Sequence, residues 1–235
     1  MSVNLLIVED DDRVRASLRL ALEDEGYEVE EAEDAEEALR HLDRNGAPDV
    51  MLVDLMLGEM DGFTCIRHVR HNHDVPIIVV SARDDTHDVV AALEAGADDY
   101  VTKPFEVKEI TARMRALRRR AGGFAERATP TDTVLDPDTP ALVLSQGSGT
   151  VRRGDEPIHL TLTEFRLLCE LAEAPGLVLS RQHLLETVWD RGFFGDERIV
   201  DVHVRRLRTK IERDPSDPKL VITVRGLGYR LDARN

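Results

Sequence analysis

The chain has 235 residues, of which 42% are hydrophobic, and its formal net charge is −15. This length predicts one or two domains, and the apolar content is enough for a sizeable core. No apolar stretch is long enough to cross a membrane, and no basic segment followed by an apolar one opens the chain, so we expect a cytoplasmic protein without a membrane partner. Cys65 and Cys169 are predicted to be buried free thiols.

The charge is unevenly divided along the chain. Residues 1–121 carry 15 Lys and Arg against 28 Asp and Glu, a formal charge of −13, whereas residues 122–235 carry −2. Within the second part, residues 198–213 hold six basic and two acidic residues. This distribution suits an acidic regulatory domain joined to an anion-binding one, or an acidic protein with one solvated basic helix face.

Residues 1–120 alternate short apolar runs with amphipathic helical patterns, separated by glycine and proline. The expected strands are 5–8, 28–31, 50–54, 77–81 and 99–102, and the expected helices are 13–25, 35–45, 62–70, 86–95 and 107–120. Five strand–helix units predict an α/β domain with a doubly wound five-stranded parallel sheet.

Residues 121–131 are predicted to be a linker, and the pattern then changes. The stretch 132–160 favours a small antiparallel sheet with strands at 141–145 and 150–152. Helices are expected at 161–174, 181–189 and 198–213, the first with the Thr161–Glu164 spacing of a capping box. Strands at 220–224 and 229–231 would close a hairpin. This order predicts an α+β winged helix-turn-helix domain over residues 132–235.

Polar side chains follow four of the expected strands at their carboxyl ends. Asp54 ends a buried apolar run, where a carboxylate is costly unless it is compensated. In a doubly wound sheet the carboxyl ends of the strands gather functional groups at one edge. The groups expected there are Glu9, Asp10, Asp54, Ser81 and Lys103. Clustered acids with one lysine indicate a metal and phosphoryl site.

The first domain resembles the CheY-like receiver domain of response regulators. The motifs are LLIVEDD, PDVMLVDLML, MDGF, PIIVVSAR and GADDYVTKPF, and the resemblance covers residues 3–120. It implies that Asp54 accepts a phosphoryl group from a sensor histidine kinase, and that Mg²⁺ (or Mn²⁺) binds nearby. The implied roles are metal binding by Glu9, Asp10, Asp54 and the backbone carbonyl of Met56, phosphoryl contacts by Ser81 and Lys103, a cis Lys103–Pro104 bond, and a conformational switch involving Ser81 and Tyr100.

The loop after Asp54 departs from the family pattern. Gly58-Glu59 stands where Pro-Gly is usual, so the loop gains freedom and a negative charge near the site. We expect altered metal affinity or phosphorylation kinetics, not a loss of either.

The helix expected at 198–213 has two contrasting faces at about 100° per residue. One face is apolar and holds Val200, Val204, Leu207 and Ile211. The opposite face holds Arg198, Val202, Arg205, Arg206, Thr209 and Arg213. An arginine-rich face suits the major groove of DNA, and a basic face without a ligand is the alternative. Arg225, beside Gly226, can reach a minor groove.

The second domain resembles the effector domain of the OmpR/PhoB subfamily. The matching stretches are LTLTEFRLLCELA, VLSRQHLLETVWD, RIVDVHVRRLRTKIE and ITVRGLGYRL, covering most of residues 158–231. The resemblance implies binding to promoter DNA, as direct repeats, by a regulator that contacts RNA polymerase. The implied DNA contacts are Arg198, His203, Arg205, Arg206 and Arg208 on the helix, Trp189 and Thr223 beside phosphates, and Arg225 on the wing.

The same subfamily resemblance implies dimerisation of the phosphorylated receiver domain. The expected interface residues are Asp98, Asp99, Glu109, Arg113 and Arg118. Val89 stands where a basic partner for Glu109 is common, so we expect a weaker or altered homodimer.

Two other functions compete with a phosphorylation-controlled transcription regulator. An aspartyl-phosphate phosphatase usually has a second acid two residues after its nucleophile, where this chain has Met56, so we expect no enzyme beyond slow autodephosphorylation. A DNA-binding regulator with a constitutive receiver dimer is the second. The intact acid, serine and lysine set argues against it, but the Gly58-Glu59 and Val89 departures leave it open.

Overall fold

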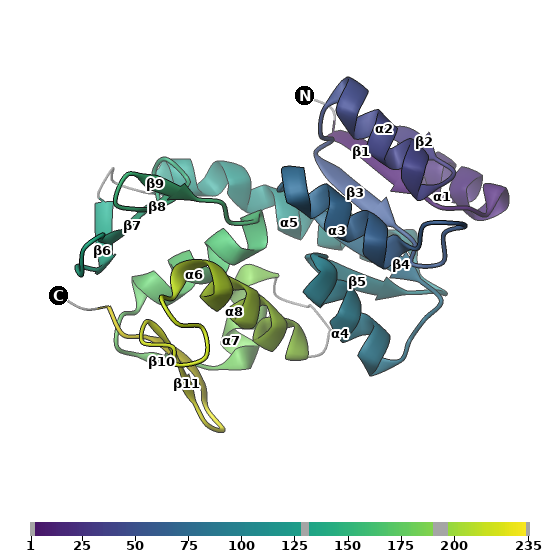
Figure 1. Ribbon diagram of the computed structural model, residues 1–235. Helices are drawn as coiled ribbons and strands as arrows, with labels where there is room; N and C mark the ends of the chain where they lie inside the picture. The colour runs from purple at the N-terminus through teal and green to yellow at the C-terminus, as the bar shows by residue number, and fades with distance from the viewer. Residues whose placement is uncertain (1–2, 128–131, 190–196, 234–235) are drawn as a thin grey trace. The chain divides into compact units, whose positions relative to one another are not determined.

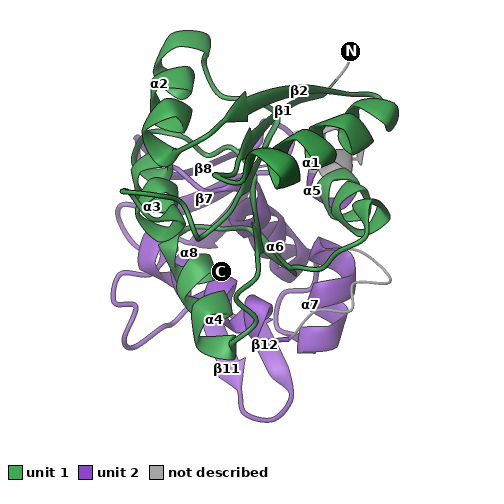
Figure 2. Ribbon diagram, turned by 90° about the vertical axis from the view of Figure 1, so that its right-hand side faces the viewer, with its two compact units in different colours: residues 1–115 green, residues 116–235 purple. Residues whose placement is uncertain are grey.

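The computed structural model describes residues 3–127, 132–189 and 197–233, without the side chains of residues 118–127. The chain divides into two compact units, residues 1–115 and 116–235 (Figure 2). Each unit has its own sheets and its own buried apolar side chains.

The first unit is built on a five-stranded parallel sheet with the order β2-β1-β3-β4-β5 (Figure 1). Its strands are β1 Val3–Val8, β2 Tyr27–Ala32, β3 Val50–Val53, β4 Ile77–Ser81 and β5 Asp99–Thr102. β3 and β4 are buried along their whole length, as expected for central strands covered on both faces. The predicted doubly wound sheet is confirmed.

Five helices cover the two faces of this sheet. They are α1 Asp12–Asp24, α2 Ala35–Asn45, α3 Gly62–Asn72, α4 Thr86–Ala95 and α5 Val107–Arg127. α2, α3 and α4 lie on one face, and α1 and α5 lie on the other (Figure 1). The first four begin at aspartates whose carboxylates accept backbone N–H groups of the first turn: Asp11, Asp34, Asp61 and Asp85. Some of the acidity of this domain therefore serves helix capping.

In its described residues, the second unit contains two antiparallel sheets and, after the end of α5, three helices. The four-stranded sheet joins β6 Asp132–Asp136, β7 Leu142–Ser145, β8 Thr150–Arg153 and β9 Glu156–Ile158. The helices are α6 Leu162–Glu173, α7 Arg181–Val188 and α8 Arg198–Ile211. The hairpin of β11 Val221–Val224 and β12 Gly228–Leu231 pairs with the short β10 Val178–Leu179. These elements form a winged helix-turn-helix arrangement, and both thiols of the chain are buried and free as predicted.

Two features differ from the sequence-based expectation. α5 continues to Arg127, so the first seven residues of the predicted linker 121–131 are helical, and residues 128–131 lie outside the described part. β10 was not predicted, because two residues carry no periodic signal and the strand exists only by pairing with β12. In the described part of the chain, no helix is both long enough and apolar enough for a membrane span.

Candidate functional site

The carboxyl edge of the parallel sheet brings together the polar groups that the sequence places after its strands. Glu9 follows β1, Asp54 follows β3, Ser81 ends β4 and Lys103 follows β5. Backbone bonds hold these positions in register, with the Asp54 amide donating to Val8 and the Lys103 amide donating to Ser81. Because parallel strands end at one edge, residues far apart in sequence become neighbours here.

Lys103 lies at the centre of this cluster. Its Nζ is 2.6 Å from Oδ2 of Asp54 and 2.7 Å from Oε2 of Glu9. The other oxygen of Asp54, Oδ1, accepts the backbone N–H of Met56 at 3.0 Å. Asp54 is therefore held from both sides, by an ammonium group and by the backbone of the following loop. The Lys103–Pro104 bond is cis, as the receiver resemblance implies.

The two buried carboxyl groups of this cluster differ in their pKa. Burial raises the pKa of Glu9 above its ordinary value; the charge of Asp54 adds to that rise, and Lys103 offsets it only in part. Burial also acts to raise the pKa of Asp54, but the hydrogen bonds from Lys103 and the Met56 amide outweigh it, so this pKa is lowered. Asp54 therefore remains an anion, whereas the ionised form of Glu9 is disfavoured by the folded structure.

Three carboxylates of the site could hold a metal ion. One ligand oxygen from each of Glu9, Asp10 and Asp54 lies within 4.8 Å of the others. Asp10 is exposed, whereas the other two are buried, so the cluster opens to solvent on one side. Hard divalent cations such as Mg²⁺ prefer oxygen ligands and keep several waters, which fits this open acidic set. A cation would also relieve the cost of ionised Glu9.

Replacing Glu9 by glutamine should raise the melting temperature by a few degrees near neutral pH without divalent cations. The pKa of Glu9 is higher in the folded state than in the unfolded state. Such a carboxyl group does not reduce stability below its unfolded pKa, where it is protonated in both states, but it reduces stability as the pH rises through the folded pKa. The advantage of the variant should thus vanish below the ordinary pKa of 4.5 and grow above it. Thermal melts across this pH range, with the exposed Glu59→Gln as control, check this; equal melting temperatures at neutral pH would contradict it.

Ser81 and Tyr100 occupy the positions that the receiver resemblance implies for a switch. Ser81 is fully buried, and its hydroxyl lies close enough to Asp54 to help lower the pKa of that carboxyl group. The Tyr100 hydroxyl donates to the backbone carbonyl of Arg83 at 2.5 Å, and burial raises the pKa of this phenol to about 12. Ser81 thus lies beside both the Asp54 carboxylate and the Tyr100 phenol, whose pKa values it acts to lower.

Two glycines that follow Asp54, Gly58 in the loop and Gly62 at the start of α3, have opposite surroundings. A Cβ on Gly62 would lie 2.1 Å from the carbonyl oxygen of Asp54 and 2.6 Å from Cα of Leu55. A Cβ on Gly58 would meet nothing within 4 Å. The sequence pattern singled out Gly58 and missed Gly62, although Gly62 is the one that limits how closely α3 approaches Asp54.

The apolar face of α8 is wider than the helical wheel predicted. Val200, Val204 and Leu207 are buried, but so are Ile199 and Val202. His203 is 0% exposed; its Nδ1 lies 2.9 Å from the carbonyl oxygen of Ile199, and its ring meets Trp189 edge-on at 5.0 Å. The predicted placement of Val202 on the arginine face is wrong, and a DNA contact by His203 does not fit its burial. Both side chains help to build the core under the helix.

The basic residues of α8 fall into two groups. Arg198 and Arg205 are exposed. Arg206 pairs with Glu164 at 2.9 Å. Arg208 donates to the Val221 carbonyl and to Oγ1 of Thr223, each at 2.8 Å, and so ties the helix to the hairpin.

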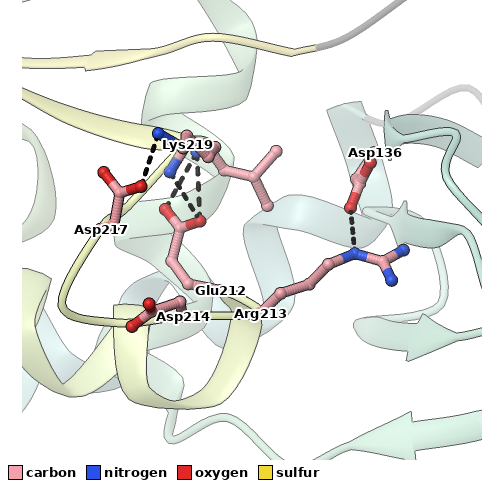
Figure 3. A pocket seen from close by; sticks show the side chains of 7 residues that line it. Asp136, Glu212, Arg213, Asp214, Asp217 and Lys219 are labelled. Atoms are coloured by element: carbon pink, nitrogen blue, oxygen red, sulfur yellow. Dashed lines mark hydrogen bonds and ion pairs between the residues drawn. The ribbon is translucent and has the colours of Figure 1, made fainter.

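Arg213, just past the end of α8, pairs with Asp136 of β6 at 3.2 Å beside a small pocket (Figure 3). In the same pocket, the Glu212 carboxylate accepts the backbone N–H groups of Lys219 and Leu220. This end of the helix is clamped to two strands and is not presented as a free basic surface.

The remaining predicted DNA contacts lie in contrasting surroundings. Thr223 and Arg225 are exposed on the hairpin, whereas Trp189 is buried and packs in the core. Two groups that sequence reasoning did not assign hold this surface together. Asp201 pairs with Arg181 and accepts the Tyr229 hydroxyl, each at 2.6 Å, and Glu164 binds α8 from α6. Glu164 was visible in the sequence only as a capping residue.

The predicted interface residues of the first domain differ in their exposure to solvent and in their ion-pair partners. Glu109 is exposed and pairs with Arg113 at 2.7 Å. Asp99 is buried and also pairs with Arg113, at 3.0 Å. Asp98 is 1% exposed and pairs with Arg70 of α3 at 2.6 Å, so a cross-subunit pair from Asp98 does not fit the structure. The side chain of Arg118 lies outside the described residues.

Comparison with known families agrees with both halves of the chain. Residues 5–115 match the response regulator receiver domain, and residues 155–231 match the C-terminal domain of transcriptional regulatory proteins. The chain is 45% identical over 229 residues to the transcriptional regulatory protein AfsQ1 of Streptomyces coelicolor, covering 97% of this chain and 98% of that one. It is 46% identical over 236 residues to the transcriptional regulatory protein CseB of Streptomyces avermitilis, with 98% of each covered.

Solved structures give the same relationship. A mutant of the protein RitR superposes with a TM-score of 0.78 at 26% identity, covering 99% of this chain and all of that one. The response regulator DrrB, described as a Thermotoga maritima OmpR/PhoB homologue, has 30% identity and a TM-score of 0.50, with 99% of this chain and all of that one covered. The chain therefore belongs to the OmpR/PhoB-type two-component response regulators, which control transcription.

Proposed function

We propose that Asp54 is the phosphoacceptor of this regulator and takes its phosphoryl group from a sensor histidine kinase in a Mg²⁺-dependent reaction. One oxygen of Asp54 would form the new P–O bond as the P–N bond of the kinase phosphohistidine breaks. Lys103, 2.6 Å from Asp54 Oδ2, would then pair with a phosphoryl oxygen, and the buried Ser81 hydroxyl would donate to another. Mg²⁺ on Glu9, Asp10, Asp54 and the Met56 carbonyl would neutralise the added negative charge.

The observation that carries this proposal is the cluster of polar groups that keeps the buried carboxyl group of Asp54 ionised. Its carboxylate is kept ionised although it is buried, because the Lys103 hydrogen bond in particular lowers its pKa against the effect of desolvation. An ionised carboxylate is the nucleophilic form. The ammonium group of Lys103 and the buried hydroxyl of Ser81 lie on neighbouring strand ends, and both act on Asp54.

We propose that phosphorylation of this regulator takes place in the cytoplasm and promotes a dimer that binds DNA. Asp99, Glu109 and Arg113 would form part of the receiver interface, with the Asp99–Arg113 pair exchanging partners between subunits. Two protomers would bind direct repeats about one helical turn apart, with Arg198 and Arg205 in the major groove and Arg225 on the hairpin in the minor groove. RNA polymerase would be the further partner at the promoter.

Incubating the full-length protein with a small phosphodonor and Mg²⁺ tests the phosphoacceptor. We expect intact mass to rise by one phosphoryl group in the wild type and not in Asp54→Ala, and omitting Mg²⁺ should suppress the gain. Light scattering should show a monomer-to-dimer shift only in the phosphorylated wild type. Modification of Asp54→Ala to the same extent would refute the assignment, and an unchanged dimer before and after treatment would favour a constitutive regulator.

A further inference from the structure

Arg15, near the start of α1, reaches back to the loop that carries Glu9 and Asp10. Its Nη1 donates to the backbone carbonyl of Glu9 at 2.6 Å, and its Nη2 is 2.5 Å from Oδ1 of Asp12. The Glu9 carbonyl belongs to the peptide group that joins Glu9 to Asp10. One guanidinium group therefore holds the peptide group between two of the three carboxylates that could bind a metal ion.

The Arg15 side chain is itself held from several sides. It is 13% exposed, and its Nε lies 3.8 Å from Oε1 of Glu31 on β2. A guanidinium group presents its N–H donors in a rigid planar fork, so it can bind the Glu9 carbonyl and the Asp12 carboxylate at the same time. Partners on the loop, on the first turn of α1 and on β2 thus fix the position from which Arg15 acts.

Arg19, about one turn further along α1, provides a comparison. It pairs with Glu23 at 3.0 Å and with Glu31 at 3.1 Å, and its side chain is 32% exposed. Both of these partners are carboxylates outside the loop of residues 9–12. Ion pairs that stabilise α1 and join it to β2 explain the position of Arg19. They do not explain why Arg15 also binds the backbone beside Asp10.

Asp10 is the candidate metal ligand that most needs such support. It is exposed, whereas Glu9 and Asp54 are buried, so packing around its side chain restrains it less. The next residue, Asp11, is the N-cap of α1 and accepts two backbone N–H groups of the first turn. Asp10 therefore lies between two fixed points of the backbone, the Glu9 carbonyl on one side and the helix cap on the other.

We propose that Arg15 is a positioning residue for the divalent cation, because it holds the Glu9–Asp10 peptide group so that the Asp10 carboxylate faces the metal site. This inference rests on the proposed Mg²⁺ site at Asp54. Groups that orient the ligands of a metal change its affinity by about 10–100-fold when they are removed. The charge of Arg15 alone acts in the opposite direction, because a nearby cation repels Mg²⁺. The sign of the change in affinity therefore separates positioning from charge.

Metal binding to the full-length, unphosphorylated protein tests this role without any reaction. We would titrate the protein with Mn²⁺ and follow the paramagnetic resonance signal of the free ion. The binding that Asp10→Asn removes defines the site. Arg15→Met should weaken this binding roughly tenfold or more. Arg15→Lys keeps the charge but not the planar fork, so it should also weaken binding, by a smaller factor.

Arg19→Met is the matched control, because it removes a guanidinium group that pairs with Glu31 from the same helix. It should bind Mn²⁺ at least as tightly as the wild type. A second measurement is the rate of phosphorylation by a small phosphodonor over a series of Mg²⁺ concentrations. Arg15→Met should need roughly tenfold more Mg²⁺ for its half-maximal rate, and its maximal rate should stay close to that of the wild type.

The outcomes separate this inference from the proposed function. Binding by Arg15→Met that equals or exceeds that of the wild type would overturn the role of Arg15 and leave the metal site standing. Equal weakening in Arg19→Met would assign the effect to α1 as a whole, and would also overturn it. If Arg15→Met fails to fold, wild-type affinity in Arg15→Lys would refute positioning. Mn²⁺ binding that Asp10→Asn leaves unchanged would overturn the proposed metal site as well.

Discussion

Replacing Gly62 by alanine should destabilise the first domain by about 3 kcal/mol and slow phosphorylation of Asp54 at least tenfold. Alanine is the better helix former by up to about 1 kcal/mol, so local propensity alone predicts the opposite sign. The reason is contact: the new Cβ would lie 2.1 Å from the Asp54 carbonyl oxygen and 2.6 Å from Cα of Leu55. Both neighbours are backbone atoms, so the chain at the end of β3 must itself move.

Urea unfolding and the rate of phosphorylation by a small phosphodonor check this prediction. Gly58→Ala is the matched control, because the same methyl group there meets nothing within 4 Å and the backbone is not in the left-handed region. The control should keep wild-type stability and phosphorylation. If Gly62→Ala proved as stable and as reactive as Gly58→Ala, the close approach of α3 to Asp54 would be disproved.

Replacing Lys103 by methionine should cost roughly 2–3 kcal/mol of stability near neutral pH without divalent cations. This is less than the cost for a fully buried pair, because the Lys103 side chain is 19% exposed and water can reach it. Glu9 and Asp54 would lose the ammonium group 2.6–2.7 Å from them and would repel each other. We therefore expect both of their pKa values to rise.

The pH dependence of this loss has a defined sign. When the pKa of a carboxyl group is higher in the folded state than in the unfolded state, the group leaves stability unchanged at low pH. It lowers stability as the pH rises through the folded pKa. The stability gap between wild type and Lys103→Met should thus be small in acid and largest at neutral pH. Added Mg²⁺ should stabilise the variant more than the wild type, because the cation replaces the missing charge.

Urea unfolding at several pH values, with and without Mg²⁺, measures both effects. Lys103→Met combined with Glu9→Gln should recover part of the lost stability, since only one buried carboxylate then remains beside Asp10. A gap that is widest in acid would show that Lys103 does not stabilise these carboxylates.

The amino-acid sequence by itself determined the fold class and the cluster of polar groups at the carboxyl edge of the parallel sheet. Apolar runs that lead into Glu9, Asp54, Ser81 and Lys103 define both the strands and the polar groups at their ends. Parallel strands must end at one edge, so strand ends become neighbours without any knowledge of distances. Membership of the OmpR/PhoB-type family is then indicated by motifs that span both halves.

The tertiary structure alone decided which partners the charged side chains have. Arg206 and Arg208 have the same sequence signature, yet the first pairs with Glu164 of α6 and the second donates to Thr223 of the hairpin. The sequence predicted that Asp98 lies at the receiver interface, but in the structure this acid pairs with Arg70. A helical wheel fixes the angle between residues of one helix, but not the rotation of that helix against its neighbours.

That rotation depends on long-range packing, which local periodicity does not encode. It buries His203 and Val202, and it brings Lys210 to an acid 46 residues earlier in the chain. The same holds for Gly62, whose importance comes from a backbone contact and not from its own conformation. The ends of strands are positions along the chain, so the sequence alone can locate them. Contacts between residues that are distant in the sequence depend on tertiary packing, so only the structure can locate those.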